Sequence, residues 1–211
     1  MKLGSKPIII HTIEQFLLND RIDKILVCTS QDWTSYMEDL LKKYIKDSSN
    51  VIVIEGGATR DETVMCGCKY IKENFGIHKN DIIITHDAVR PFITQRIIDD
   101  NIAGLKEADA VDTCIPTTDT IIEVYHDGSG YIKTIPNRKF LFNGQTPQSF
   151  KLDVLMKLHN ELSENEKNTL TDACKIFVLK DQKVKVVMGE TFNIKITTMF
   201  DLELANAILL E

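Results

Sequence analysis

A carboxylate and a guanidinium group lie three residues apart, directly after a short apolar run. The run is residues 81–85, and Asp87 and Arg90 follow it in His86-Asp-Ala-Val-Arg90. Carboxylate oxygens are the ligands that Mg²⁺ prefers, and a bound Mg²⁺ bridges phosphate oxygens. Arg90 would either bind a phosphate or pair with Asp87 to orient it. The segment therefore indicates metal-assisted phosphate chemistry, with a purely structural Asp–Arg pair as the alternative.

A second pattern suited to phosphate groups follows the apolar run at residues 51–55. It contains Gly56, Gly57, Arg60 and Thr63. Adjacent glycines let a ligand approach the backbone closely, an arginine presents a planar fork of donors, and a helix N-terminus favours anions. We expect the helix to begin at Thr63. The alternative is an ordinary strand-to-helix turn that Thr63 caps.

Three more polar side chains lie in segments that are ambiguous when taken singly. Lys195 falls in residues 193–197, which alternate like a strand. Its ammonium group would either reach solvent or point at a phosphate. Arg138 lies in a polar loop, where a solvated charge is the simpler interpretation. Thr146 precedes Pro147 in what we interpret as the entry to a turn.

Alternating strands and helices must position these side chains. Strands are predicted at residues 24–29, 51–55, 81–85 and 110–115, and helices at 33–44, 63–75 and 94–107. Such alternation favours an α/β fold with a Rossmann-like, doubly wound, mostly parallel sheet. Ligands of open α/β sheets bind at the carboxyl ends of the strands. We therefore expect Asp87, Arg60 and Lys195 to converge at one edge of the sheet.

The alternation breaks in the middle of the chain. Residues 119–125 and 131–135 read as two strands around His126-Asp-Gly-Ser-Gly130, which predicts a β-hairpin within an arm of about residues 117–140. The arm is a candidate dimer contact, and the alternative is an edge hairpin packed on its own subunit. Later elements are helices at 151–162 and 171–179, strands at 183–188 and 193–197, and a helix at 202–210 that follows capping-box spacing at 198–201. We expect one domain over residues 1–211.

Composition narrows the classes of function. The net charge of −6 gives no general basic surface for nucleic acid or membrane. The sequence has no apolar run long enough for a transmembrane span and no signal-peptide pattern, so the cytoplasm is expected. The five cysteines fit no zinc-binding spacing and are expected to be reduced thiols.

Taken in order, the motifs of this chain resemble those of the polyol-phosphate cytidylyltransferases. The matching runs are Lys6-Pro-Ile-Ile-Ile-His-Thr12, Gly56-Gly-x-x-Arg60-x-x-Thr63, His86-Asp-Ala-Val-Arg-Pro-Phe92, Asp119-Thr-Ile121, Gln145-Thr-Pro-Gln148, Thr171-Asp172 and Asn193-Ile-Lys-Ile-Thr197. They span essentially all of the sequence. The resemblance implies a nucleotidyltransferase fold, CTP and a small polyol phosphate as substrates, and a homodimer joined through the arm.

The resemblance also implies a role for each matching residue. Asp87 would hold Mg²⁺ near the substrate phosphates, with Arg90 beside it. Lys195 would stabilise the charge of the transition state at the α-phosphorus. The remaining residues form two binding sets: Gly57, Thr63 and Ala88 line the cytidine site with Arg60 bracing that loop, and Thr120, Arg138, Thr146 and Thr171 bind the polyol phosphate. Thr120 and Arg138 would reach across the dimer.

Two departures from the family pattern stand out. The family begins with a strand, a Gly-rich loop carrying an arginine, and a Pro-Lys-Gln segment. This sequence starts at Met1-Lys-Leu-Gly-Ser-Lys-Pro7, which resembles the stretch just after that lysine. The Gly-rich loop is missing from the sequence, and we expect a truncated chain rather than a lost half-site. The smaller departure is Ala58, where some relatives carry an acidic residue.

The acceptor is indicated by finer similarity within the family. Residues 110–113, 144–150 and 171–175 look more like the ribitol 5-phosphate branch, whereas 116–120 look closer to the 2-C-methylerythritol 4-phosphate branch. We favour D-ribitol 5-phosphate, a substrate of cell-wall polymer synthesis, over the acceptor of isoprenoid synthesis. Two further hypotheses are a sugar-1-phosphate uridylyl- or cytidylyltransferase and a non-catalytic nucleotide-binding homologue.

Overall fold

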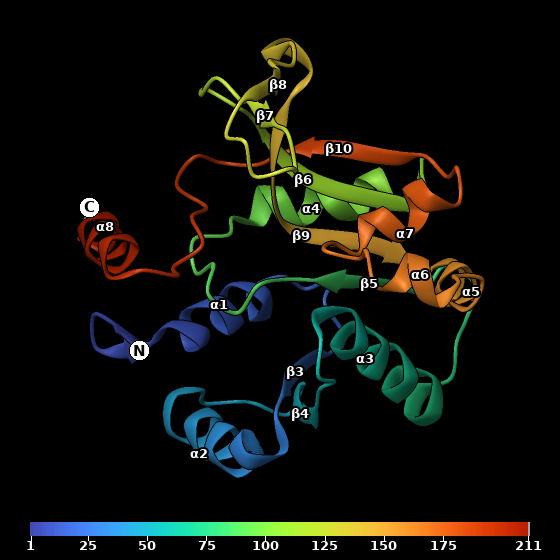
Figure 1. Ribbon diagram of the computed structural model, residues 1–211. Helices are drawn as coiled ribbons and strands as arrows, with labels where there is room; N and C mark the ends of the chain where they lie inside the picture. Colours follow the sequence, from blue (N-terminus) through green and yellow to red (C-terminus); the bar gives the residue numbers. More distant parts are fainter. Residues whose placement is uncertain (211) are drawn as a thin grey trace.

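The computed structural model describes residues 1–210, and it confirms the predicted alternation of strands and helices (Figure 1). The first half contains β3 (Ile25–Thr29), α2 (Thr34–Tyr44), β4 (Val51–Glu55), α3 (Arg60–Phe75), β5 (Ile82–Thr85), α4 (Gln95–Gly104) and β6 (Ala110–Pro116). Before them lie β1 (Lys2–Leu3), β2 (Lys6–Pro7) and α1 (Ile8–Leu17). After them come β7 (Glu123–Val124), β8 (Ile132–Thr134), β9 (Phe142–Lys151), α5 (Leu152–Asn160), α6 (Glu164–Lys167), α7 (Cys174–Leu179), β10 (Val184–Met188) and α8 (Met199–Leu209).

The central sheet has four strands in the order β10-β6-β9-β5. Strand β10 is parallel to β6, whereas β9 is antiparallel to both β6 and β5. Strands β5, β6 and β10 therefore run in one direction and β9 alone runs against them. Strands β3 and β4 form a separate parallel pair. The fold is thus the expected mixed α/β type with mostly parallel strands.

Strand β9 corrects one sequence-based prediction. The segment around Thr146 and Pro147, interpreted as a turn, lies inside this ten-residue strand and is buried from Gln145 to Phe150. Proline cannot donate a ladder hydrogen bond, so it is tolerated inside a sheet only at an irregularity. The register shifts there, because Asp112 pairs with Gln148 but Cys114 pairs with Gly144. This bulge accommodates Pro147.

Helices cover both faces of the central sheet. Successive residues of a strand point to opposite faces. On β9, Ser149 Oγ donates to Asn101 Oδ1 of α4 at 2.9 Å, and the next ring, Phe150, stacks on Phe177 of α7 with centroids 5.4 Å apart. Helix α4 therefore lies on one face and α7 on the other, which places the polar residues of β9 between two packed layers.

Four other boundaries differ from the predictions. Residues 193–197 are not a strand but an extended segment, attached where Ile196 N donates to Val89 O at 3.0 Å. Helix α3 begins at Arg60 with Thr59 as its cap, and α7 begins at Cys174 rather than Thr171. Helix α8 begins at Met199, and its predicted capping box, Thr198 with Asp201, is present.

The hairpin is confirmed, although its paired strands are shorter than predicted. Strands β7 and β8 are antiparallel and project from one end of the central sheet (Figure 1). The five cysteines are all free, as expected. Within the described residues, no helix combines the length and the apolar character needed to cross a bilayer.

Candidate active site

Three cationic side chains from separate segments meet at the carboxylate of Asp87. Arg90 Nε lies 3.1 Å from Asp87 Oδ2, Lys195 Nζ lies 3.3 Å from the same oxygen, and Arg60 Nη2 lies 3.9 Å from Oδ1. Asp87 follows β5 and Arg60 opens α3, so two strand ends supply them. The expected convergence of Asp87, Arg60 and Lys195 is therefore present in the structure.

The cations keep Asp87 ionised. Burial would raise the pKa of this carboxyl, but the hydrogen bond from Arg90 and the charges of Lys195 and Arg60 outweigh burial and lower the pKa below its usual value. The Asp87 side chain is 14% exposed, whereas those of Lys195 and Arg60 are 46% and 40% exposed. Two cationic groups thus face solvent around a nearly buried anion, which leaves them available to a phosphate ligand.

Arg90 is the internal member of this cluster. Its side chain is only 11% exposed, and its Nη1 donates to Asn193 O at 2.8 Å. Of the two roles considered for Arg90, the ion pair with Asp87 is the one that the structure shows. Because Asn193 lies two residues before Lys195, Arg90 also ties the Lys195 segment to the end of β5.

The glycine loop before α3 has a compact geometry that explains its sequence. A Cβ added to Gly57 would lie 2.2 Å from the Cβ of Glu62, so only glycine fits. Thr63 Oγ1 accepts from Gly57 N at 3.1 Å and lies 2.8 Å from Thr59 O. Thr63 therefore braces the loop one turn inside the helix, and Thr59 is the cap.

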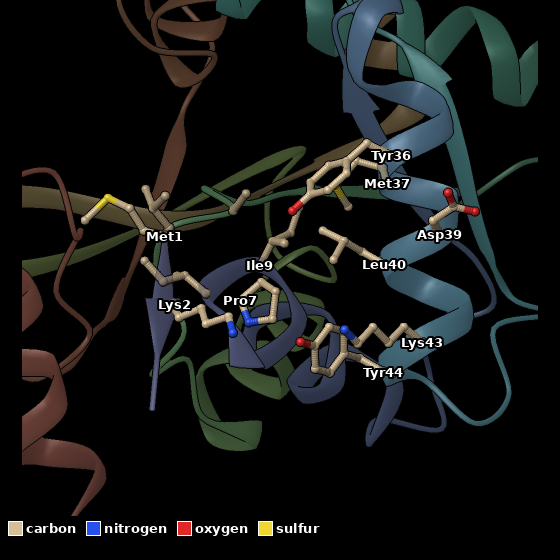
Figure 2. A pocket seen from close by; sticks show the side chains of 13 residues that line it. Met1, Lys2, Pro7, Ile9, Tyr36, Met37, Asp39, Leu40, Lys43 and Tyr44 are labelled. Atoms are coloured by element: carbon tan, nitrogen blue, oxygen red, sulfur yellow. The ribbon is translucent and has the colours of Figure 1, made fainter. Parts of the chain in front are cut away.

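Thr146 and Ala88 border Asp87 directly. Asp87 N donates to the hydroxyl of Thr146 at 3.1 Å, and Ala88 O accepts from Thr12 Oγ1 at 2.9 Å. Beyond Ala88 lies a cavity of about 610 Å³ between α1 and α2, with Pro7, Ile9 and other apolar side chains in its wall (Figure 2). Ala88 thus has the charged cluster on one side and an apolar cavity on the other.

The remaining predicted residues lie farther from Asp87. Thr171 is exposed and lines a second cavity of about 710 Å³ together with Gly57 and Arg60. Thr120 and Arg138 are exposed residues of the arm, where Arg138 Nη1 donates to Thr118 O at 2.6 Å. Among residues 1–210, neither of these arm residues hydrogen-bonds or forms an ion pair with the Asp87 cluster.

Two places in the structure could hold a divalent cation, and they do not suit it equally: the group around Asp112 and the single carboxylate of Asp87. Asp112, Asp172 and Cys174 place ligand atoms within 4.8 Å of one another. However, the carboxylates already accept from Gln148 Nε2, Asp172 also accepts from Cys174 N, and burial raises the pKa of the Cys174 thiol. Mg²⁺ prefers oxygen ligands with free lone pairs. Asp87 Oδ1 suits the cation better, because its ion pair within the described chain is the long one to Arg60.

Three buried amide side chains support the site, and no local sequence pattern identifies them in advance. Gln145 Nε2 donates to Glu190 O at 2.9 Å, and Asn193 Nδ2 donates to Thr146 O at 3.0 Å. Gln148 is fully buried and reaches the Arg60 side chain. These residues hold the segments that carry Thr146 and Lys195. The nearest signal in the sequence is the polar run Gln145-Thr-Pro-Gln148, which by composition favours a turn.

Comparisons with known proteins identify the family of this chain. The family model described as 2-C-methyl-D-erythritol 4-phosphate cytidylyltransferase (IspD) matches residues 1–211. A relative from Lactiplantibacillus plantarum, named ribitol-5-phosphate cytidylyltransferase, is 51% identical over 206 residues, which are 98% of this chain and 87% of the relative.

Solved structures show the same fold. The 4-diphosphocytidyl-2C-methyl-D-erythritol synthase of Anaerococcus prevotii matches with a TM-score of 0.86 at 30% identity, covering 100% of this chain and 88% of that one. The Francisella tularensis 2-C-methyl-D-erythritol 4-phosphate cytidylyltransferase has a TM-score of 0.82 at 27% identity, covering 98% and 90% of the two chains. The chain with the Asp87 cluster therefore belongs to the IspD family of cytidylyltransferases.

Proposed function

We propose that this enzyme transfers CMP from CTP to D-ribitol 5-phosphate, forming CDP-ribitol and pyrophosphate. The acceptor is supported by the relative named ribitol-5-phosphate cytidylyltransferase, which is 51% identical to this chain. The single observation that supports the chemistry is the convergence of Lys195 and Arg60 on Asp87, because it concentrates exposed positive charge at the end of β5. Charge neutralisation and positioning are what nucleotidyl transfer requires.

The reaction is an in-line displacement. A phosphate oxygen of the acceptor bonds to the α-phosphorus of CTP while the bond to pyrophosphate breaks, and no covalent enzyme intermediate is needed. Lys195 stabilises the negative charge that develops at the α-phosphorus, and Arg60 braces the glycine loop. Asp87 would hold Mg²⁺, which supplies further charge neutralisation when bound. Gly57, Thr63 and Ala88 line the cytidine site.

The acceptor site combines two subunits in this proposal. Thr146 and Thr171 bind ribitol 5-phosphate from within the chain. Thr120 and Arg138 reach a neighbouring subunit through the arm. This assignment is supported by their exposure and by the contact of Arg138 with Thr118 O of its own arm rather than with the Asp87 cluster. Residues 1–211 then act as one cytidylyltransferase domain in a homodimer.

A substrate panel tests the proposal. Pyrophosphate release is measured with CTP or UTP against ribitol 5-phosphate and 2-C-methylerythritol 4-phosphate, and the product is identified by mass spectrometry. We expect the highest kcat/KM for CTP with ribitol 5-phosphate. Preference for 2-C-methylerythritol 4-phosphate, the acceptor in the family description, would overturn the choice of acceptor. Heat of CTP binding without any turnover would instead indicate a non-catalytic homologue.

A further inference from the structure

One buried amide connects the nucleotide side of the site to the polyol-phosphate side. Gln148 lies on β9 and is 0% exposed. Its Nε2 lies 3.0 Å from Asp112 Oδ1 and 2.5 Å from Asp172 Oδ2, and its Oε1 lies 3.4 Å from Arg60 Nη2. Three elements that are distant in sequence, namely β6, the start of α3 and the loop before α7, therefore meet at one side chain.

The chemistry of the neighbours determines the orientation of this amide. Two carboxylates can only accept, so both hydrogens of the Gln148 amide must point at Asp112 and Asp172. The guanidinium of Arg60 can only donate, so the amide oxygen must face it. A reversed amide would place its oxygen against two carboxylates and its hydrogens against a cation. The orientation is therefore determined without ambiguity.

Each partner of Gln148 leads to a part of the substrate site. Arg60 faces Asp87 and begins the helix that follows the glycine loop. Asp172 follows Thr171 directly, and its other oxygen accepts from Cys174 N at 2.7 Å. Both Arg60 and Thr171 line the cavity of about 710 Å³. The position of Gln148 thus bears on the distance between the arginine and the threonine.

The two carboxylates depend on the amide that separates them. Burial raises the pKa of Asp112, and the charge of Asp172 raises it further, against the lowering effect of the hydrogen bond from Gln148. The other titratable groups that face them are Arg60, Cys114 and Cys174, and burial raises the pKa values of both thiols so that they stay neutral. Without the amide donor, two partly buried carboxylates would repel each other.

We propose that Gln148 is a positioning residue that sets Arg60 for the nucleotide and Thr171, through Asp172, for the polyol phosphate. This role rests on the proposed function, since it assigns the two substrates to the two sides of the amide. Gln148 acts through Arg60 and Asp172, and it need not touch either substrate. Its removal should therefore weaken the binding of both substrates more than it slows chemistry.

Gln148→Leu removes the amide at nearly constant volume, and the exposed Gln31→Leu serves as its control. We expect the KM values for CTP and for the polyol phosphate each to rise about tenfold, the factor typical of losing a hydrogen bond to a charged group. If Gln148→Leu does not fold, the linear side chain of Gln148→Met carries the same measurements.

The double variant Gln148→Leu/Asp112→Asn separates the contact of Gln148 with Arg60 from its contact with Asp172. The new amide at position 112 can donate to Asp172 but cannot accept from Arg60 in the same place. We expect the KM for the polyol phosphate to return towards the wild-type value while the KM for CTP stays raised. Unchanged KM values in Gln148→Leu, or equal recovery of both in the double variant, would overturn the proposal.

Failure of the proposed function gives a different result from failure of this inference. If the wild-type protein does not convert ribitol 5-phosphate, the proposed acceptor is wrong. Calorimetry with CTP still tests the contact between Gln148 and Arg60 in that case, and Gln148→Leu should weaken CTP binding about tenfold. Equal CTP affinity in the wild-type protein and this variant would reject the positioning role itself.

Discussion

The Asp87 cluster and the β7–β8 arm differ in how their side chains are satisfied. At the cluster, three cations surround a carboxylate that is 14% exposed, and every partner comes from the same chain. On the arm, large apolar side chains face outward, including Tyr131 at 73% and Phe140 at 79% exposed. Contiguous exposed apolar surface usually marks an interaction site. The cluster is thus preorganised within one chain, whereas the arm leaves large apolar side chains exposed, as expected of the interface that we propose.

The largest expected effect breaks the cluster at its exposed cation. Lys195→Ala should lower kcat by about 100- to 1000-fold, because one preorganised group at developing charge contributes about 3–4 kcal/mol. Circular dichroism and thermal unfolding should show an intact fold. The exposed Lys183→Ala is the control. A near-normal rate in Lys195→Ala would remove this residue from the mechanism.

Asp87→Asn tests the anion at the centre. The pKa of Asp87 is lowered in the folded protein, so its stabilising effect is present above the unfolded pKa of about 4 and is lost as pH falls through the folded pKa. At pH 7 the variant should be less stable by about 2 kcal/mol, the usual value for hydrogen bonds to charged groups. Urea unfolding from pH 7 to pH 3 should show this difference shrinking in acid. A difference that does not depend on pH would contradict the account.

Arg138→Ala probes the arm's proposed contribution to the neighbouring site. The KM for the polyol phosphate should rise about tenfold, as for loss of one charge-assisted hydrogen bond, while the KM for CTP stays near its original value. Steady-state kinetics with each substrate varied in turn measures both. Equal increases in the two constants would argue against a role across the dimer.

The smallest effect concerns assembly alone. Ile132→Asp places a charge on the exposed apolar surface of β8, where Ile132 is 53% exposed. Because a charge resists burial, the proposed dimer should dissociate at a protein concentration about tenfold higher than that of the wild type, or more. Light scattering over a dilution series measures this, with Val178→Asp on α7 as a control of similar exposure. Identical dilution profiles for the wild type and Ile132→Asp would exclude the arm as the interface.

Local sequence patterns predict the strands and helices of the first half of the chain. Strands β3 to β6 and the helices between them follow from β-branched runs and helical periodicity, and the strand-end rule predicts that Arg60 and Asp87 meet. Helix α1 does not follow in this way, because Ile8-Ile-Ile10 favours a strand by propensity and its helical form depends on packing against α2. Residues 193–197 alternate like a strand, although their backbone partners are Arg90 and Val89 rather than a neighbouring strand.

The buried amides illustrate the remaining limit. Gln148 gains its role from Arg60, which lies 88 positions earlier, and from Asp172, which lies 24 positions later. No local periodicity encodes such partners. Turn-forming residues such as Pro147 conceal β9 because burial between two helical layers overrides their propensity. The residues that bear charge at strand ends are therefore predictable, and the residues that orient them are not.

The alternation along β9 has a consequence for how the family can vary. Thr146 contacts Asp87 and Gln148 contacts Arg60, while Ser149 and Phe150 enter opposite layers of the core. Residues that border the Asp87 cluster and residues that pack the core therefore lie next to one another on the same strand. Deleting one residue of β9 before Ser149 would shift the pairing register by one position, and it would turn Phe150 towards α4 and Ser149 towards α7. Among natural relatives, insertions and deletions should therefore be common in the arm's turn at residues 126–130 and rare in β9.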